Sequence, residues 1–169
     1  MLTNHDSLSI RTATLGDAAV VASIYNHYIL NSVVTFEVEA IEANEISRRM
    51  QVVASRSLPW IIAEWDGEVV GYAFASQWHH RAAYQNSAEA TVYVEPSYCR
   101  RGIGVRLLKQ LLKLVSERNI HTLISGISLP NDASVSLHEK FGFQKVAHYK
   151  EVGFKFDTWI DVGYWQKMI

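Results

Sequence analysis

One stretch of the chain, residues 89–113, combines a predicted strand, a basic glycine turn and a predicted helix. The β-branched and aromatic run at 91–94 favours a strand, which Glu95-Pro96 would end. Apolar residues then recur at three- and four-residue spacing over 103–115, which predicts an amphipathic helix. Between them, Arg100-Arg101-Gly102-Ile103-Gly104 would bring bare backbone N–H groups to the positive end of that helix. This order of elements predicts a site for a phosphate-bearing ligand.

The glycine turn by itself does not identify the ligand. Gly102 and Gly104 form neither a G-x-G-x-x-G fingerprint nor a G-x-x-x-x-G-K-[ST] loop, which argues against a dinucleotide or a nucleoside triphosphate. The formal net charge of -1 gives no overall attraction for nucleic acid or for an anionic membrane, so we expect neither as a partner. Arg100 and Arg101 then form a local basic patch, and the alternative is a solvated charge pair with no ligand.

The length and apolar content of the chain suit one domain spanning residues 1–169. With 49% hydrophobic residues, a chain of 169 residues can bury roughly 70% of its unfolded surface. The single cysteine, Cys99, excludes an intramolecular disulfide and is compatible with a reducing compartment. The N-terminus lacks the pattern of a signal peptide, and no apolar run approaches the roughly 20 residues of a membrane span. We therefore expect a soluble cytoplasmic protein.

Apolar periodicity predicts strands and helices along the remaining chain. Asp66-Gly67 between two apolar runs predicts a β-hairpin, and Thr14-Leu15-Gly16-Asp17 resembles a capping box that starts a helix. Loops are expected at 31–40 and, with Gly153 and Asp157, between the last two strands. The predicted strands cover 7–12, 60–64, 69–74, 91–94, 122–127, 144–149 and 158–166, and the predicted helices 18–28, 46–55, 103–115 and 133–141. This order indicates a single α/β or α+β domain.

The polar segment 77–87 interrupts the strands and is rich in aromatic and ionisable side chains. Loops on a rigid scaffold often carry binding residues, so we expect this segment to form a wall of a substrate site. His79 and His80 raise the possibility of a metal pair, but adjacent residues of an extended chain face opposite sides. We therefore predict no metal site.

The glycine turn, in its setting between strand and helix, resembles the acyl-CoA signature of the GNAT superfamily of N-acetyltransferases, Q/R-x-x-G-x-G/A. The resemblance implies a mixed, mainly antiparallel central sheet flanked by helices, with central strands that splay apart at the acyl-CoA site. It implies acetyl-CoA as co-substrate, without a metal. Cys99 departs from the pattern because the consensus has Gln or Arg there, which removes a side-chain donor and leaves the backbone cradle. The implied cofactor-binding residues are Val92, Tyr93, Val94, Arg100, Arg101, Gly102, Ile103, Gly104, Val105 and Asn131.

A longer run, LPNDASVSLHEKFGF at 129–143, resembles the phosphinothricin N-acetyltransferase branch of that superfamily. The segments Asn26-His27-Tyr28, 89–94, Gly153-Phe154-Lys155 and 161–166 resemble it as well, so the likeness covers nearly the whole chain. That branch acetylates the α-amino group of phosphinothricin, methionine sulfoximine or related compact amino acids, such as methionine sulfone, and is typically dimeric. The resemblance therefore implies a small amino acid substrate and a homodimer.

Amide formation needs a group that accepts a proton from the attacking amine, because an α-amine is mostly protonated near neutral pH. Glu89 matches the proposed general base of the branch, and a carboxylate exposed at a strand edge is the other interpretation. His138 matches the second ionisable site residue, with its role as base, proton relay or substrate ligand left open. Asn131 matches the residue that binds the pantetheine arm, and an N-terminal turn residue of a helix is compatible with that role.

The resemblance also implies substrate-binding roles for Phe36, His79, Arg81, Tyr84, Glu89 and Thr91. His79 stands where relatives carry a lysine, which favours a neutral methionine sulfoximine or sulfone over doubly anionic phosphinothricin. Two alternatives remain: acetylation of a peptide N-terminus or a polyamine, and a non-catalytic acyl-CoA-binding sensor. The sequence leaves open the physiological acceptor and whether detoxification is the selected role.

Overall fold

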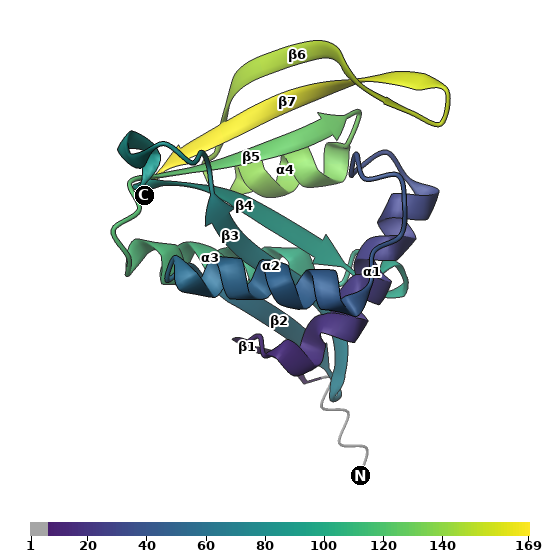
Figure 1. Ribbon diagram of the computed structural model, residues 1–169, viewed down its shortest axis with the longest axis vertical. Coiled ribbons are helices and arrows are strands. Elements are labelled where there is room, and N and C mark those ends of the chain that lie inside the picture. Colours follow the sequence, from purple (N-terminus) through teal and green to yellow (C-terminus); the bar gives the residue numbers. More distant parts are fainter. Residues whose placement is uncertain (1–6) are drawn as a thin grey trace.

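The computed structural model describes residues 7–169, so residues 1–6 of the predicted domain and most of the N-terminal segment lie outside the described residues. Within 7–169 the strands form one seven-stranded sheet in the order β1-β2-β3-β4-β5-β7-β6 (Figure 1). The elements in chain order are β1 (Leu8–Thr12), α1 (Ala18–Asn31), α2 (Ala43–Ser55), β2 (Trp60–Trp65), β3 (Glu68–Gln77), β4 (Ser87–Val94), α3 (Ile103–Ser116), β5 (Thr122–Leu129), α4 (Asp132–Lys140), β6 (Gln144–Lys155) and β7 (Thr158–Met168), with single 3₁₀ turns at Leu15–Asp17, Ala82–Tyr84 and Pro96–Tyr98.

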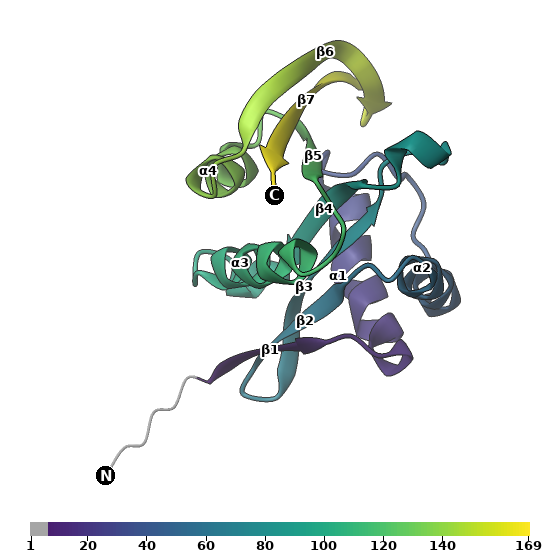
Figure 2. The same ribbon diagram turned by 90° about the vertical axis from the view of Figure 1, so that its left-hand side faces the viewer.

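Helices cover both faces of the sheet (Figure 2). On one face, α3 buries Leu107, Leu108 and Leu111 against alternate residues of β2–β5 such as Ile61 and Leu123. On the other face, α1 and α2 pack on the intervening residues, among them Ile62 and Tyr72. Successive side chains of a strand point to opposite faces, so the near-continuous apolar runs of the central strands supply both layers.

The neighbouring strands β4 and β5 are parallel, whereas the other paired strands are antiparallel. Their ladder covers 87–89 against 122–124 and ends at Glu89 and Ile124. Beyond that point the hydroxyl of Ser125 donates to the carbonyl of Ala90 at 3.3 Å. The two strands therefore diverge in the centre of the sheet, as the resemblance implied.

Most predicted elements are confirmed, including the capping box, where the Thr14 amide donates to Asp17 Oδ2 at 2.7 Å. Two boundaries were wrong. Strand β4 begins at Ser87, so Glu89 lies inside the strand rather than before it. Gly153 lies within β6 rather than in a loop, because β6 continues to Lys155 and pairs Gly153 with Ile160. The ends of strands are hard to locate from the sequence, because pairing with a strand that is distant in the chain decides where a strand begins and ends.

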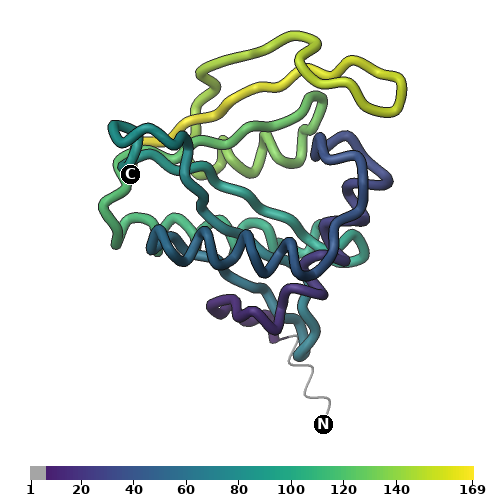
Figure 3. Tube along the Cα trace, in the orientation of Figure 1, coloured from purple at the N-terminus to yellow at the C-terminus, as the bar shows by residue number. Residues whose placement is uncertain are grey.

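The hairpin of β6 and β7 extends along one end of the molecule, and the loop after α1 lies at the same end (Figure 3). The ammonium of Lys155 donates to the carbonyl of Thr35 at 2.9 Å, which ties the hairpin to that loop. Phe36 covers Gly153 so closely that a Cβ built on the glycine would lie 2.4 Å from the phenyl Cζ. The hairpin and the loop are thus in direct contact above the divergence of β4 and β5.

Candidate active site

A pocket of about 750 Å³ opens where β4 and β5 diverge. A volume in this range is ordinary for a site that takes a small organic ligand. Its walls combine backbone and side chains from elements that are far apart in the sequence. The lining residues are Tyr28, Val34 and Thr35, then 89–94, 98–100, 102–105 and 125–128, and finally Asn131, Ala133, Ser134, 136–138 and Lys140.

The basic glycine turn forms one end of this pocket. Arg100 and Gly102 have φ angles of 64° and 77°, a left-handed turn that leads directly into α3. The helix begins at Ile103 without a side-chain cap, so its first N–H groups and the positive end of its dipole are available to an anion. Arg100 lines the pocket, but Arg101 does not: its guanidinium lies 4.9 Å from the Tyr98 ring and 5.4 Å from the Trp65 ring.

Glu89 lies where the β4–β5 ladder ends and lines the same pocket. Burial raises the pKa of its carboxyl above the usual 4.5, and a hydrogen bond from the backbone of Gly126 partly opposes this. Gly126 allows a close approach here, since a Cβ on it would lie only 3.1 Å from the Tyr164 ring and 3.6 Å from the Glu89 carboxylate. A half-buried carboxylate with a raised pKa is suited to accept a proton near neutral pH.

His138 is buried in α4 and also lines the pocket. Its Nδ1 lies 2.8 Å from the carbonyl of Ser134, which can only accept, so Nδ1 carries the proton. Its Nε2 is buried without a hydrogen-bond partner among the described residues, and burial lowers the pKa of the ring below 6.5. The neutral ring therefore presents a bare lone pair at Nε2, which can accept a proton or a hydrogen bond and has none to give.

The remaining residues for which the resemblance implies cofactor binding also line the pocket. They are residues 92–94 and 103–105 and Asn131, whose side-chain oxygen accepts from the Ser134 amide and caps α4. Cys99 is exposed and lines the pocket, with its sulfur 3.9 Å from the Tyr28 hydroxyl. His138 on α4 is the one histidine that lines this pocket among residues 7–169, and no hydrogen bond joins it to Cys99 there.

Some pocket residues were missed by the sequence analysis. Tyr28 reaches from α1 and donates to the carbonyl of Val94 at 2.5 Å, so it fixes the end of β4. Thr35 accepts the Lys155 ammonium through its carbonyl, and Ser128 has a buried hydroxyl without a partner among residues 7–169. Tyr28 had a sequence signal, because it belongs to a segment on which the resemblance rests. The others come together through contacts between distant elements.

The predicted substrate residues fall into two groups. Glu89 and Thr91 line the large pocket, whereas Phe36, His79, Arg81 and Tyr84 are exposed and do not. The ring centroid of His79 lies 5.0 Å from that of Tyr84 and 4.9 Å from that of Trp78. Trp78 in turn lies 5.7 Å from Tyr164, next to Gly126 and Glu89. The segment 77–87 is therefore joined to the Glu89 side of the pocket by aromatic contacts, without closing over it.

These features fit the acetyl-CoA site that the resemblance implies, since an uncapped helix start suits a pyrophosphate and the gap between β4 and β5 suits an extended arm. Within 7–169, no group of three or more histidine, cysteine, aspartate or glutamate side chains is arranged to hold a metal ion. No helix in the same range is both long and apolar enough to cross a membrane.

Comparison with known proteins identifies the family of the chain. The family model described as "Acetyltransferase (GNAT) domain" matches residues 10–163. The chain is 39% identical to a phosphinothricin N-acetyltransferase of Streptomyces viridochromogenes, over 95% of this chain and 87% of that protein. It is 30% identical to an L-methionine sulfoximine/L-methionine sulfone acetyltransferase of Salmonella typhimurium, over 94% of this chain and 93% of that protein. Among solved structures, the fold matches that of a phosphinothricin acetyltransferase of Sinorhizobium meliloti in complex with acetyl-CoA. The TM-score is 0.93 at 29% identity, and the match covers 96% of this chain and 88% of that chain.

Proposed function

The chain belongs to the GNAT family of acetyltransferases, and from that premise we propose that it acetylates the α-amino group of a compact amino acid of the phosphinothricin, methionine sulfoximine or methionine sulfone type. The observation that carries the proposal is one pocket that holds both an anion-binding helix start and a half-buried carboxylate with a raised pKa. A non-catalytic acyl-CoA sensor would have no need for the second feature.

In this proposal the cofactor half of the site is mainly backbone. The N–H groups of 101–105 bind the pyrophosphate of acetyl-CoA, and Arg100 adds positive charge. The pantetheine arm runs through the gap between β4 and β5, beside Asn131. Arg101 contributes through its stacking on Tyr98 and Trp65, which holds the turn against the body of the protein.

The chemical roles follow from the protonation states. Glu89 accepts a proton from the amine of the acceptor, directly or through a water, because its raised pKa makes it a stronger base than an exposed carboxylate. A backbone N–H near Val94 stabilises negative charge on the carbonyl oxygen during attack. His138 Nε2, as an acceptor, receives a hydrogen bond from a ligand N–H or a proton from a relay water. The enzyme itself forms no covalent intermediate.

On the acceptor side, Thr91 and Glu89 contact the amino acid in the pocket, and Phe36, His79, Arg81 and Tyr84 form the rim. The guanidinium of Arg81 is suited to a carboxylate, since its fork donates two parallel hydrogen bonds. Because the rim side chains are exposed, we propose that they close on the amino acid as it binds. A role in detoxification and resistance to herbicide-type amino acids, and a cytoplasmic location, stay predictions.

A release assay for the CoA thiol tests the proposal. Purified protein is given acetyl-CoA and, in separate reactions, methionine sulfone, methionine sulfoximine, phosphinothricin, free amino acids, polyamines and short peptides. We expect thiol release with at least one of the three analogues, at a rate well above that with peptides or polyamines. Preference for a peptide or a polyamine would support the alternative acceptors, and no release with any amine would support the sensor.

We further propose that the chain forms a homodimer through the β6–β7 hairpin. Its large apolar side chains are unusually exposed: Tyr149, Phe154 and Phe156 are each more than half exposed and Trp159 is 60% exposed. An apolar surface of this kind on a hairpin that continues the sheet is suited to a second copy. Sedimentation velocity is expected to give a dimer for the parent and a monomer for Trp159→Glu, and a monomeric parent would contradict the proposal.

A further inference from the structure

A second, smaller pocket of about 120 Å³ lies on the α1–α2 face of the sheet. It is walled by aromatic rings, including Trp60 and Phe74, which stack with ring centroids 4.1 Å apart. Arg49 and Tyr25 form its polar side. A buried water needs about 10–15 Å³ of such volume, so this pocket has room for a short side chain of several atoms.

The small pocket adjoins the proposed reaction centre. Thr91 and Tyr93 line both pockets, so they form the shared wall. Phe74 pairs with Thr91 across β3 and β4, and Trp60 pairs with Phe74 across β2 and β3. Glu89, Thr91 and Tyr93 alternate along β4 and point to the same face, and Glu89 is about 7 Å from Thr91 along the strand. An amino acid with its amine at Glu89 can therefore extend its side chain toward Trp60.

Trp60 brings an unpaired hydrogen-bond donor to the lining of this pocket. The residue is only 6% exposed, and its indole nitrogen is buried without a hydrogen-bond partner among residues 7–169. Most buried polar groups in native proteins are paired, and an indole nitrogen can only donate. The group that completes this site therefore carries a hydrogen-bond acceptor and is otherwise apolar enough to lie among aromatic rings.

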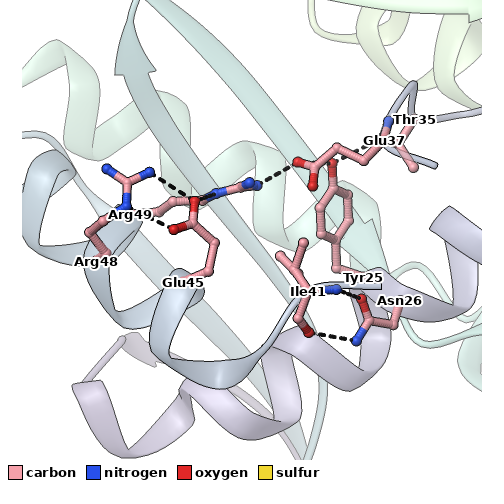
Figure 4. A network of polar contacts seen from close by, with 8 residues as sticks. All are labelled: Tyr25, Asn26, Thr35, Glu37, Ile41, Glu45, Arg48 and Arg49. Atoms are coloured by element: carbon pink, nitrogen blue, oxygen red, sulfur yellow. Dashed lines mark hydrogen bonds and ion pairs between the residues drawn. The ribbon is translucent and has the colours of Figure 1, made fainter. Parts of the chain in front are cut away.

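The charges beside the pocket cancel. Arg49 donates to Glu37 at 2.6 Å and to Glu45 at 2.7 Å, and Glu45 also binds Arg48 (Figure 4). Two arginines and two glutamates leave no net charge, and the buried Lys155 ammonium does not line this pocket. A second anionic group has no unpaired cation to meet here, whereas an uncharged oxygen needs none.

We propose that this small pocket receives the side chain of the acceptor amino acid, and that Trp60 donates to an uncharged oxygen at its tip, as in a sulfone or sulfoximine. The inference rests on the proposed function for the position of the amine, and it adds the residue that selects the side chain. It predicts that methionine sulfone binds more tightly than methionine, which lacks the oxygens, and than phosphinothricin, which carries an anionic phosphinate.

Isothermal titration calorimetry with CoA present tests the inference separately from turnover. Trp60→Phe removes the donor and keeps an aromatic ring, so methionine sulfone is expected to bind about 5–20-fold more weakly, while the affinity for methionine is unchanged. The matched control is Trp165→Phe on β7, which also removes an indole donor, here one that donates to Glu139 outside both pockets, and is expected to leave both acceptor affinities as in the parent.

An equal loss for sulfone and methionine would mean that Trp60 acts only through packing, and would overturn the inference. Unchanged sulfone affinity in Trp60→Phe, or tighter binding of phosphinothricin than of sulfone by the parent, would overturn it as well. Sulfone binding that depends on Trp60 without release of the CoA thiol would instead leave the pocket assigned and contradict the proposed acetyl transfer.

Discussion

The two halves of the proposed site are built in different ways. The cofactor half comes mainly from one continuous segment, 89–105, and uses backbone N–H groups at the start of α3. The acceptor half comes from side chains on β2, β3, α1, the 31–40 loop and the hairpin, which meet only in the folded protein. A site built from backbone groups is expected to tolerate changes of side chain, such as Cys99 at the usual Gln or Arg position. A side-chain site changes its ligand with a single residue.

Glu89 joins the two halves, and its loss is expected to have the largest effect. Glu89→Gln keeps the shape but removes the base, so kcat/KM for the acceptor is expected to fall by about 100-fold or more. Because burial raises the carboxyl pKa, the rate of the parent falls as pH drops through a value above 4.5, where the carboxylate takes up a proton. Steady-state rates from pH 5 to 9 measure both effects.

The control for this substitution is Glu95→Gln. Glu95 follows Val94, accepts from the Ser97 amide and does not line the large pocket, so its variant is expected to keep the parent rate and the parent pH profile. A Glu89→Gln enzyme as fast as the parent across this pH range would remove Glu89 as the base and leave water or His138 Nε2 in that role.

Gly102 tests the backbone half with the next largest effect. Its φ of 77° is a left-handed conformation, and a Cβ there would meet no atom within 4 Å. Gly102→Ala therefore adds backbone strain of roughly 1–2 kcal/mol without a clash, and the turn relaxes away from the anion-binding geometry. We expect KM for acetyl-CoA to rise about 10-fold, with KM for the acceptor unchanged.

Gly67→Ala is the matched control for this strain. Gly67 has a φ of 87° in the β2–β3 turn, and its Cβ would also meet no atom within 4 Å. Both variants are expected to lose a similar free energy of unfolding, measured by urea denaturation, but only Gly102→Ala changes KM for acetyl-CoA. An equal rise in KM for both would mean that global destabilisation, rather than the turn, weakens the cofactor site.

The same contrast explains which features of the fold and the site could be predicted from the sequence. The glycine turn, the Asp66-Gly67 hairpin and helix α3 depend on local conformational preference and periodicity, so their positions followed from nearby residues. Other features depend on contacts between residues that are distant in the sequence. They are the position of Gly153 in a strand beneath Phe36, the burial of Lys155 and the pocket at Trp60. The resemblance named rim residues such as Arg81, but only the folded chain shows them to be exposed.

Gly153 tests the side-chain half, with the smallest expected effect of the three. A Cβ in Gly153→Ala would lie 2.4 Å from Cζ of Phe36, so the phenyl ring must move. Phe36 is 41% exposed and its ring can swing outward at little cost in stability. If Phe36 forms the rim over the acceptor, KM for the amino acid rises about 3–5-fold while KM for acetyl-CoA stays unchanged.

A double-mutant cycle identifies the cause of that change. In a Phe36→Ala background the added methyl group of Gly153→Ala has no ring to displace, so the second substitution is expected to have no further effect on KM for the amino acid. Additive effects would mean that Gly153→Ala acts through the hairpin, for example by shifting Lys155 from the Thr35 carbonyl. In that case the acceptor half is controlled by the hairpin backbone, and the contrast with the cofactor half becomes weaker.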